Sequence, residues 1–164
     1  AAILEAEGAK QAQVLAAACS DRLAAVADAV AGLPRRRVVV VEWTDPPFCA
    51  GHWVPDMVGA AGAESVLGRP GQDSVRIRWE DVVAAAPDVV VVAPCGFRLD
   101  GAVGLARQLI DAGGLPPGVP VWAVDADAAY VRPGPRLVDG VEALAAALHP
   151  GLLPDRPDQV TCVS

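Results

Sequence analysis

The sequence is poor in aromatic residues, in lysine and in long apolar segments. No apolar run approaches the ~20 residues that span a bilayer, so the sequence predicts no membrane insertion. There are 13 basic residues against 20 acidic ones, which gives a net charge of −7, and the one basic cluster, 35–37, precedes an apolar run. Because no basic stripe is present to neutralise phosphates, we expect no nucleic-acid partner.

Cysteines and phosphate-binding glycine motifs are also scarce. The four cysteines, Cys19, Cys49, Cys95 and Cys162, are too few and too scattered for a disulfide scaffold. No Gly-x-Gly-x-x-Gly motif or phosphate loop follows the first strand-like run, which argues against nucleotide binding. With 53% hydrophobic residues over 164 positions, the chain has enough apolar sequence for the core of one domain.

The chain begins with a long helical pattern, predicted over 3–31. Its first half is mostly polar, and a helix of this length reaches about 40 Å, more than one small domain covers. We therefore expect its early turns to lie on a second copy or on a part that this chain lacks. Apolar residues recur at spacings of three and four in its second half and just beyond: Leu15, Cys19, Leu23, Val26, Val30 and Leu33.

Strand-like and helical patterns alternate along the rest of the chain. This alternation predicts an α/β fold, a three-layer sandwich with a parallel sheet of about four strands, preceded by the long N-terminal helix. The expected domains are the helix at 1–34, an α/β ligand-binding lobe at 35–150 and a C-terminal tail at 151–164. The predicted strands are 38–41, 65–67, 89–93 and 119–124, the predicted helices are 53–61, 79–86, 100–112 and 136–148, and Asp100 is the expected N-cap of the third of these helices.

Aromatic residues gather after the predicted strands. Ligands of open parallel sheets bind outside the carboxyl ends of the strands, and an aromatic rim there favours a flat, largely apolar ligand. The alternative is that some of these rings only cover the core. Five of the seven aromatic residues lie in or beside these loops: Trp43, Phe48, Trp53, Phe97 and Tyr130.

The loop expected at 42–51 also carries groups that bind metals. Its two consecutive prolines make it stiff, and Cys49 and His52 form a Cys-x-x-His pair just before the next helix. Together with Cys95 they are candidate metal ligands, with Asp45 or Asp127 as a further donor. His52 bonded to backbone at a helix start, and a Cys49–Cys95 disulfide, are the alternatives.

Cys95 permits an enzymatic interpretation as well. It follows a buried strand and precedes a helix, which is a common position for nucleophiles on α/β sheets. In a cysteine-dependent hydrolase, His52 would be its base and Asp125 or Asp127 would orient that base. The aromatic rim suits binding better than acyl transfer, so we expect no enzyme.

Three segments resemble the C-terminal lobe of class III periplasmic substrate-binding proteins, in particular of their cobalamin-binding branch. The segment EWTDPPFCAGHWVPDMVGAAGAESVLG is similar to the start of that lobe. WEDVVAAAPDVVVVAPCGF is similar to a helix and strand shared with haem- and siderophore-binding relatives, and YVRPGPRLVDGVEALAAALHP to the family's last loop and helix. The resemblance covers about 36–150.

The resemblance implies a binding role: capture of a corrinoid such as cobalamin and delivery to an ABC permease, with haem or a siderophore as the alternative ligand. It implies no firm cofactor: cobalamin or a related corrinoid is the ligand, and a histidine or cysteine is a candidate to ligate its cobalt. A processed transporter component would be extracytoplasmic, and a natural chain without a signal would be cytoplasmic. Carried over by position, the ligand-binding residues are Trp43, Asp45, Pro46, Phe48, His52, Trp53, Cys95, Gly96, Phe97, Asp127 and Tyr130.

Two departures from the family's pattern bear on these expectations. The N-terminal lobe is absent from the sequence, so we expect half a cleft, completed by a missing N-terminal lobe or by a homodimer partner. Where transporter-linked relatives carry an acidic docking residue, the sequence reads Tyr130-Val131-Arg132-Pro133, which weakens the transport role. Simple binding of a corrinoid or tetrapyrrole remains. A second interpretation is a dimeric interaction module without ligand, which associates through the long helix and the exposed aromatic rim.

Overall fold

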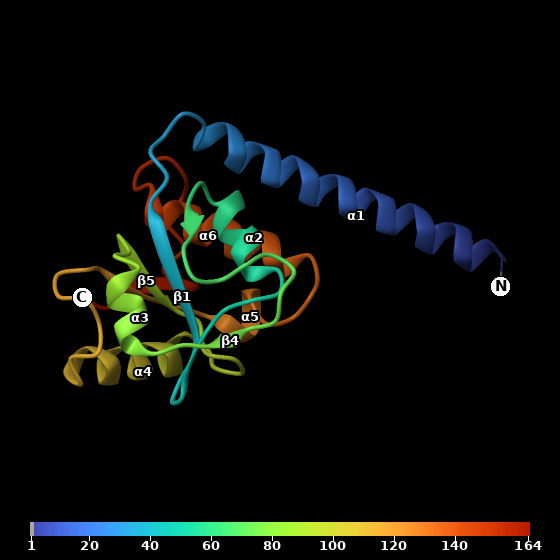
Figure 1. The fold of residues 1–164 in the computed structure, drawn as a ribbon. Helices are drawn as coiled ribbons and strands as arrows, with labels where there is room; N and C mark the ends of the chain where they lie inside the picture. The colour runs from blue at the N-terminus through green and yellow to red at the C-terminus, as the bar shows by residue number, and fades with distance from the viewer. Residues whose placement is uncertain (1) are drawn as a thin grey trace.

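Helices cover both faces of a central sheet, and one long helix extends away from it (Figure 1). The structure, a computed structural model, describes residues 2–164, with side chains from residue 8 onward. The elements are α1 (Ala2–Ala29), β1 (Arg37–Thr44), β2 (Pro47–Cys49), α2 (Val54–Ala60), β3 (Glu64–Ser65), β4 (Val75–Arg76), α3 (Trp79–Ala84), β5 (Val89–Val92), α4 (Leu99–Asp111), β6 (Val121–Val124), α5 (Ala126–Ala129), α6 (Arg136–Leu148) and β7 (Val160–Cys162).

The sheet is mixed, with seven strands in the order β4-β2-β1-β5-β6-β7 and β3 beside β1. Strands β3, β1, β5 and β6 are parallel, which agrees with the expected parallel core of about four strands. Strands β2, β4 and β7 are antiparallel additions that the sequence did not indicate. The fold is therefore the predicted α/β architecture with a wider, mixed sheet.

Alternate residues of the central strands divide between two apolar layers, because successive side chains of a strand point to opposite faces. Burial on both faces explains the unbroken valine runs in β1 and β5. One apolar layer lies between the sheet and helices α1, α2 and α6. It contains Val38, Val40, Val89 and Val91 of the strands and Leu144 of α6. Val39, Val41 and Val90 pack against α3, and Val92 packs against α4. The three layers expected from the sequence are confirmed.

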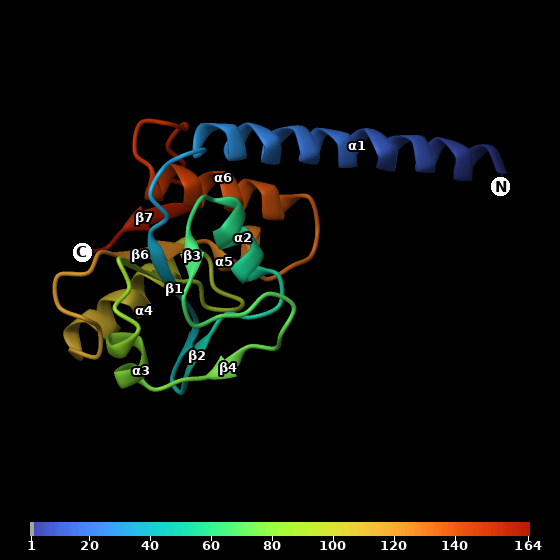
Figure 2. The ribbon, with the colours of Figure 1, turned by 45° about the horizontal axis from the view of Figure 1, so that its top comes forward.

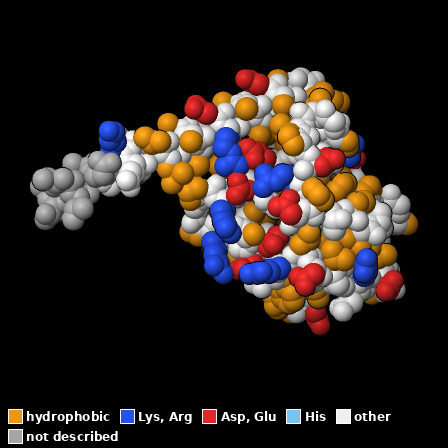
Figure 3. All heavy atoms as spheres, turned by 180° about the vertical axis from the view of Figure 1, so that it is seen from behind, with side chains coloured by type: hydrophobic (Ala, Val, Ile, Leu, Met, Phe, Trp, Pro, Cys, Tyr) orange, Lys and Arg blue, Asp and Glu red, His pale blue; other side chains and the backbone are white. Residues whose placement is uncertain are grey.

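Helix α1 contacts the lobe through its C-terminal part only (Figure 2). Val26 is 1% exposed, whereas Leu15 and Leu23, which belong to the predicted apolar stripe, are 51% and 36% exposed. The apolar stripe of α1 is thus buried at Val26 and exposed to solvent at Leu15 and Leu23, which precede Val26 in the helix. Figure 3 shows hydrophobic side chains along the projecting helix and intermixed basic and acidic side chains on the lobe. No helix among the described residues is both long and apolar enough to cross a bilayer.

Four local expectations were wrong. The loop expected at 42–51 is a hairpin, because β1 continues to Thr44 and pairs with β2. Strand β2 starts at Pro47, and the first position of a strand tolerates proline. The tail expected at 151–164 contains β7. Residues 125–135, which lie between the last predicted strand and the last predicted helix, contain α5, which the sequence did not indicate. The N-cap of α4 is Arg98, and Asp100 lies in the first turn, where the helix dipole favours an acidic side chain.

Candidate functional site

The carboxyl ends of β1, β5 and β6 surround a hollow of about 280 Å³, which we call the central hollow. This is the edge at which open parallel sheets bind ligands. Four of the residues singled out in the sequence, His52, Trp53, Cys95 and Tyr130, line it together. The remaining lining residues, which the sequence did not single out as binding residues, are Glu42, Ala50, Gly51, Val54, Ala93 and Val131.

The side of the central hollow at residues 50–54 is held by close backbone packing. A Cβ on Gly51 would lie 2.5 Å from backbone atoms of residues 72–74, so only glycine fits there. The backbone N–H of His52 donates to the Gln72 carbonyl at 2.6 Å, and the N–H of Gly71 donates to the His52 carbonyl at 2.8 Å. These contacts hold His52 at φ 55°, a left-handed conformation that is uncommon outside glycine. They leave its imidazole exposed, 5.9 Å from the Trp53 ring.

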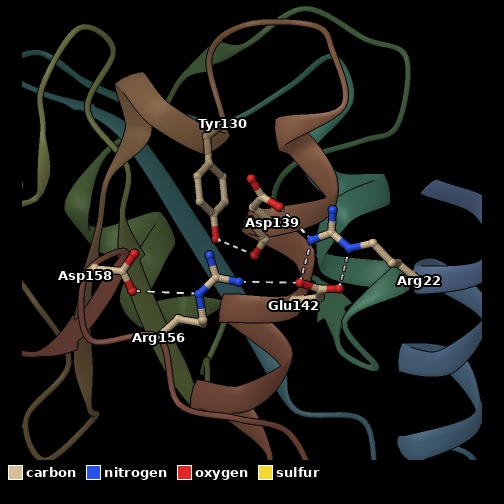
Figure 4. A network of polar contacts seen from close by, with 7 residues as sticks. Arg22, Tyr130, Asp139, Glu142, Arg156 and Asp158 are labelled. Atoms are coloured by element: carbon tan, nitrogen blue, oxygen red, sulfur yellow. Dashed lines mark hydrogen bonds and ion pairs between the residues drawn. The ribbon is translucent and has the colours of Figure 1, made fainter. Parts of the chain in front are cut away.

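Trp53 and Tyr130 form the most deeply anchored part of the central hollow. The Trp53 indole N–H donates to the Tyr130 carbonyl oxygen at 2.7 Å. The Tyr130 side chain is 2% exposed, and its hydroxyl donates to the Gly140 carbonyl oxygen of α6 at 3.2 Å (Figure 4). Burial raises the pKa of Tyr130 well above the ordinary value for tyrosine. Its phenol therefore has a structural role and is a poor candidate for an anionic metal ligand.

A second aromatic pair connects the hairpin with the loop after β5. The rings of Trp43 and Phe97 meet edge to face with centroids 6.3 Å apart, and Trp43 is 42% exposed. The Trp43 indole N–H donates to the Asp45 carbonyl oxygen at 2.9 Å, which fixes the ring relative to the hairpin. The pair is a partly open apolar surface that a flat ligand can contact. Trp43 and Phe97 line neither the central hollow nor the larger hollow near it, and the same holds for the other candidate residues of these two loops: Asp45, Pro46, Phe48 and Gly96.

That larger hollow measures about 600 Å³, and we call it the arginine hollow. Asp127, expected on the wall of the binding site, lies here and accepts a hydrogen bond from the Arg132 guanidinium at 2.6 Å. The Asp125 carboxylate accepts the backbone N–H of Ala128 at 2.9 Å and caps α5. The residues that line the arginine hollow are Arg98, Asp125, Asp127, Ala128, Arg132, Pro133, Gly134, Pro135 and Arg136.

Sequence reasoning missed the arginine hollow, although a signal was present. Arg98 follows β5, while Arg132 and Arg136 follow β6, so all three come after the carboxyl ends of neighbouring parallel strands. Their positions in the chain were enough to group them.

The structure does not bring the candidate metal ligands together. Cys49 packs with Val39 and Val41 toward α3, on the opposite side of the sheet from the cluster that contains Ala50 and Val54. Burial raises the pKa of the Cys49 thiol, and all four cysteines are free, so there is no Cys49–Cys95 disulfide. Among the described residues, no group of three or more histidine, cysteine or acidic side chains is placed to hold a metal ion.

Cys95 lacks the environment of a nucleophile. Partial burial of its thiol and, second, the negative charge of Glu42 raise the Cys95 pKa. A reactive cysteine needs the opposite, a lowered pKa produced by positive charge or a helix N-terminus. His52 lines the same hollow, but Asp127, one of the two carboxylates expected to orient it, is bonded to Arg132. The arrangement suits binding better than hydrolysis.

Comparison with known proteins gives a consistent result at the level of fold. No protein-family model matches the chain, and no curated protein matches it. A periplasmic haem-binding protein from Pseudomonas aeruginosa is similar in structure, with a TM-score of 0.73 and 25% identity over 94% of this chain and 59% of that one. The periplasmic haem-binding protein RhuT from Roseiflexus sp. RS-1 has a TM-score of 0.68 and 26% identity over 87% and 57%.

The vitamin B12-binding protein BtuF of Vibrio cholerae is similar as well, with a TM-score of 0.62 and 20% identity over 79% of this chain and 50% of that one. The chain thus spans roughly half to three fifths of the length of these structures. The portion matched includes the long helix and the α/β layers described above. The chain therefore has the fold of the class III periplasmic substrate-binding proteins, over a part of their length that corresponds to one lobe.

Proposed function

We propose that this chain is one lobe of a substrate-binding protein that holds a planar metal–macrocycle complex, a haem or a corrinoid, for an ABC importer. The observation that carries this proposal is the aromatic-rimmed central hollow at the carboxyl end of the sheet. Trp53 is fixed there by its hydrogen bond to the Tyr130 carbonyl. Trp43 and Phe97 lie outside the hollow, next in the chain to its lining residue Glu42 and two residues after its lining residue Cys95, and add a partly open ring pair. Rigid rings reduce the ordering cost of binding a flat ligand.

The size of the central hollow indicates how such a ligand would sit. Its volume of about 280 Å³ is just below the range of about 300–1,000 Å³ that small-molecule sites occupy. It therefore accommodates an edge of a macrocycle, and the remaining surface of the ligand would meet a second protein surface. A second lobe or a second copy of the chain would supply that surface.

Two ligand classes remain under this proposal, and each has its own support. The solved relatives named as haem-binding are 25% and 26% identical to this chain, against 20% for the vitamin B12-binding protein. The segment at 42–68 resembles the cobalamin-binding branch instead. The exposed His52 imidazole on the rim is the side chain best placed to ligate the metal, since burial and hydrogen bonding remove Tyr130 from that role.

The proposal is tested by titrating the purified chain with ferric protoporphyrin IX and, separately, with cobalamin. Visible absorbance and tryptophan quenching report binding, and light scattering reports the mass. We expect saturable binding of one of the two with a shifted absorbance band, and weaker binding after Trp43→Ala or Phe97→Ala. Leu152→Ala is the matched control, because Leu152 is 47% exposed and lines neither hollow.

A folded chain that shows no saturable change with either macrocycle, alone or mixed with a second lobe, would overturn the proposal. Binding that is equally strong in the Trp43 and Phe97 variants would place the ligand elsewhere on the molecule. A mass that doubles on binding would identify a second copy as the source of the opposing surface.

A further inference from the structure

The arginine hollow concentrates positive charge in an acidic protein. The chain has a net charge of −7, yet three of its 13 basic residues line this one hollow with two acidic residues. Arg132 is paired with Asp127 at 2.6 Å, and the Asp125 carboxylate caps α5. Arg98 and Arg136 form no ion pair and no side-chain hydrogen bond with any of the described residues, so their donors remain available.

Several arginines elsewhere in the chain have clear structural partners. Arg22 contacts both Asp139 and Glu142 (Figure 4), and Arg35 donates to the Gly59 and Ala63 carbonyls. Arg37 donates to the Ala85 carbonyl at 2.8 Å. Other arginines also form no ion pair and no side-chain hydrogen bond with the described residues, but none of them lines the arginine hollow: Arg36, Arg69, Arg76 and Arg107. The feature specific to Arg98 and Arg136 is that two unpartnered guanidinium groups line the same hollow. Guanidinium groups that converge on a hollow are suited to bidentate binding of an oxyanion.

The arginine hollow adjoins the central hollow, because the same two loops form both. The loop after β5 contributes Cys95 to the central hollow and Arg98 to the arginine hollow. The segment after β6 contributes Val131 to the first and Arg132 to the second. A backbone hydrogen bond from Asp127 N–H to the Phe97 carbonyl, at 3.1 Å, joins these two segments.

We infer that the arginine hollow binds carboxylate groups at the edge of the ligand whose ring occupies the central hollow. This inference rests on the proposed function and extends it by naming the ligand class: a macrocycle with free carboxylates, in preference to one whose edge carries amides. The 13-residue helix α6 begins at Arg136 without a side-chain cap, and the positive end of its dipole adds to the attraction for an anion. Asp127, one of the expected ligand-binding residues, forms an ion pair with Arg132.

The experiment compares two probes that share a ring and differ in charge: ferric protoporphyrin IX, with two free carboxylates, and its dimethyl ester. Each is titrated into the wild type, into Arg98→Gln with Arg136→Gln, and into the control Arg107→Gln. Arg107 is an exposed arginine on α4 that lines neither hollow. A third probe, benzene-1,2,4,5-tetracarboxylate, is followed by NMR of the arginine side-chain N–H groups and tests the arginine hollow without any ring.

We expect the ester to bind the wild type roughly tenfold or more weakly, the loss typical of a charge-assisted hydrogen bond, and the double variant to lose this difference. Arg107→Gln should retain it. Equal binding of acid and ester by the wild type would overturn the inference while leaving the proposed function intact. If neither porphyrin binds but the tetracarboxylate shifts the Arg98 and Arg136 signals, the proposed function fails and the anion site stands. No shift with any probe overturns the anion site.

Discussion

Cys95 distinguishes the binding interpretation from the hydrolase interpretation, because the two require opposite thiol chemistry. Partial burial and the Glu42 carboxylate raise the Cys95 pKa, so little thiolate is present near neutral pH. We expect iodoacetamide to label Cys95 more slowly than the cysteine of a short unstructured peptide, with a rate that rises as the pH approaches the raised pKa. Peptide mass spectrometry after timed alkylation at several pH values measures this rate.

Glu42→Gln provides the matched test of the cause. Removing the negative charge lowers the Cys95 pKa toward the ordinary value, and labelling at a given pH becomes faster. Rapid labelling of the wild-type thiol at pH 7 would contradict the structure and restore the hydrolase interpretation with His52 as the base.

Tyr130 is the only tyrosine in the chain, which makes its titration a direct probe of the core beneath the central hollow. Burial raises its pKa in the folded protein, whereas an unfolded chain titrates near pH 10. Above pH ~10 the unfolded state therefore binds fewer protons than the folded state, and stability is lost as the pH rises further. We expect tyrosinate absorbance to appear together with the loss of circular dichroism, in one transition.

Tyr130→Phe is the companion variant. It removes the hydroxyl that donates to Gly140, at a cost of about 1 kcal/mol at neutral pH, and it flattens the alkaline fall in stability. Tyrosinate formation near pH 10 in a protein that stays folded would show that the phenol is not buried.

At the scale of elements, Arg22 attaches helix α1 to helix α6. Its guanidinium donates to Glu142 through two nitrogens, at 2.8 and 2.6 Å, and to Asp139 at 2.6 Å (Figure 4). Because its side chain is 38% exposed, solvent screening reduces the strength of these contacts. We expect Arg22→Met to lower the free energy of unfolding by about 1 kcal/mol, measured by urea denaturation.

Arg107→Met is the control for Arg22→Met, since it removes an exposed arginine that lines neither hollow. High salt should reduce the difference between the wild type and Arg22→Met, because it screens partly exposed ion pairs. An equal loss of stability in both variants would mean that the three contacts of Arg22 contribute nothing specific.

The sequence predicted the elements whose burial leaves an apolar pattern in the chain, and it missed the short strands that depend on pairing with distant segments. Helix α6 was predicted at its observed bounds, because its apolar spacing marks one buried face. The valine runs of β1 and β5 likewise identify strands buried on both faces. Strands β4 and β7 were missed because they have two and three residues, too few for a pattern, and their pairing partners lie far away in the chain.

The candidate site shows the same limit. His52, Trp53, Cys95 and Tyr130 line one hollow, as their positions after strands indicated. The prediction that Cys49 lies with these residues was wrong. Cys49 belongs to the hairpin strand β2, which the sequence did not indicate, and its side chain lies in the apolar layer beside α3. The direction of a side chain in a hairpin depends on pairing register, which the spacing Cys-x-x-His does not contain.

At the scale of the whole molecule, the projecting part of α1 presents apolar side chains to solvent. Val14 is 65% exposed and Leu15 51% exposed, and together with Lys10, Gln11 and Ala18 they line a shallow groove on the helix. The lobe itself gains no burial from these side chains. We therefore expect Val14→Gln with Leu15→Gln to leave the free energy of unfolding within about 0.5 kcal/mol of the wild type, by urea denaturation at low protein concentration.

The same double variant decides between the two expected occupants of this helix face. If a second copy covers it, the urea concentration at which the wild type unfolds rises with protein concentration. Light scattering then gives a dimer mass for the wild type and a monomer mass for the double variant. If a separate lobe covers it, the wild type and the variant have the same monomer mass and the same transition at every concentration. The first outcome would identify a second copy as the partner of this helix face and the second a separate lobe; the similar structures carry about two fifths or more of their length beyond the part that this chain matches.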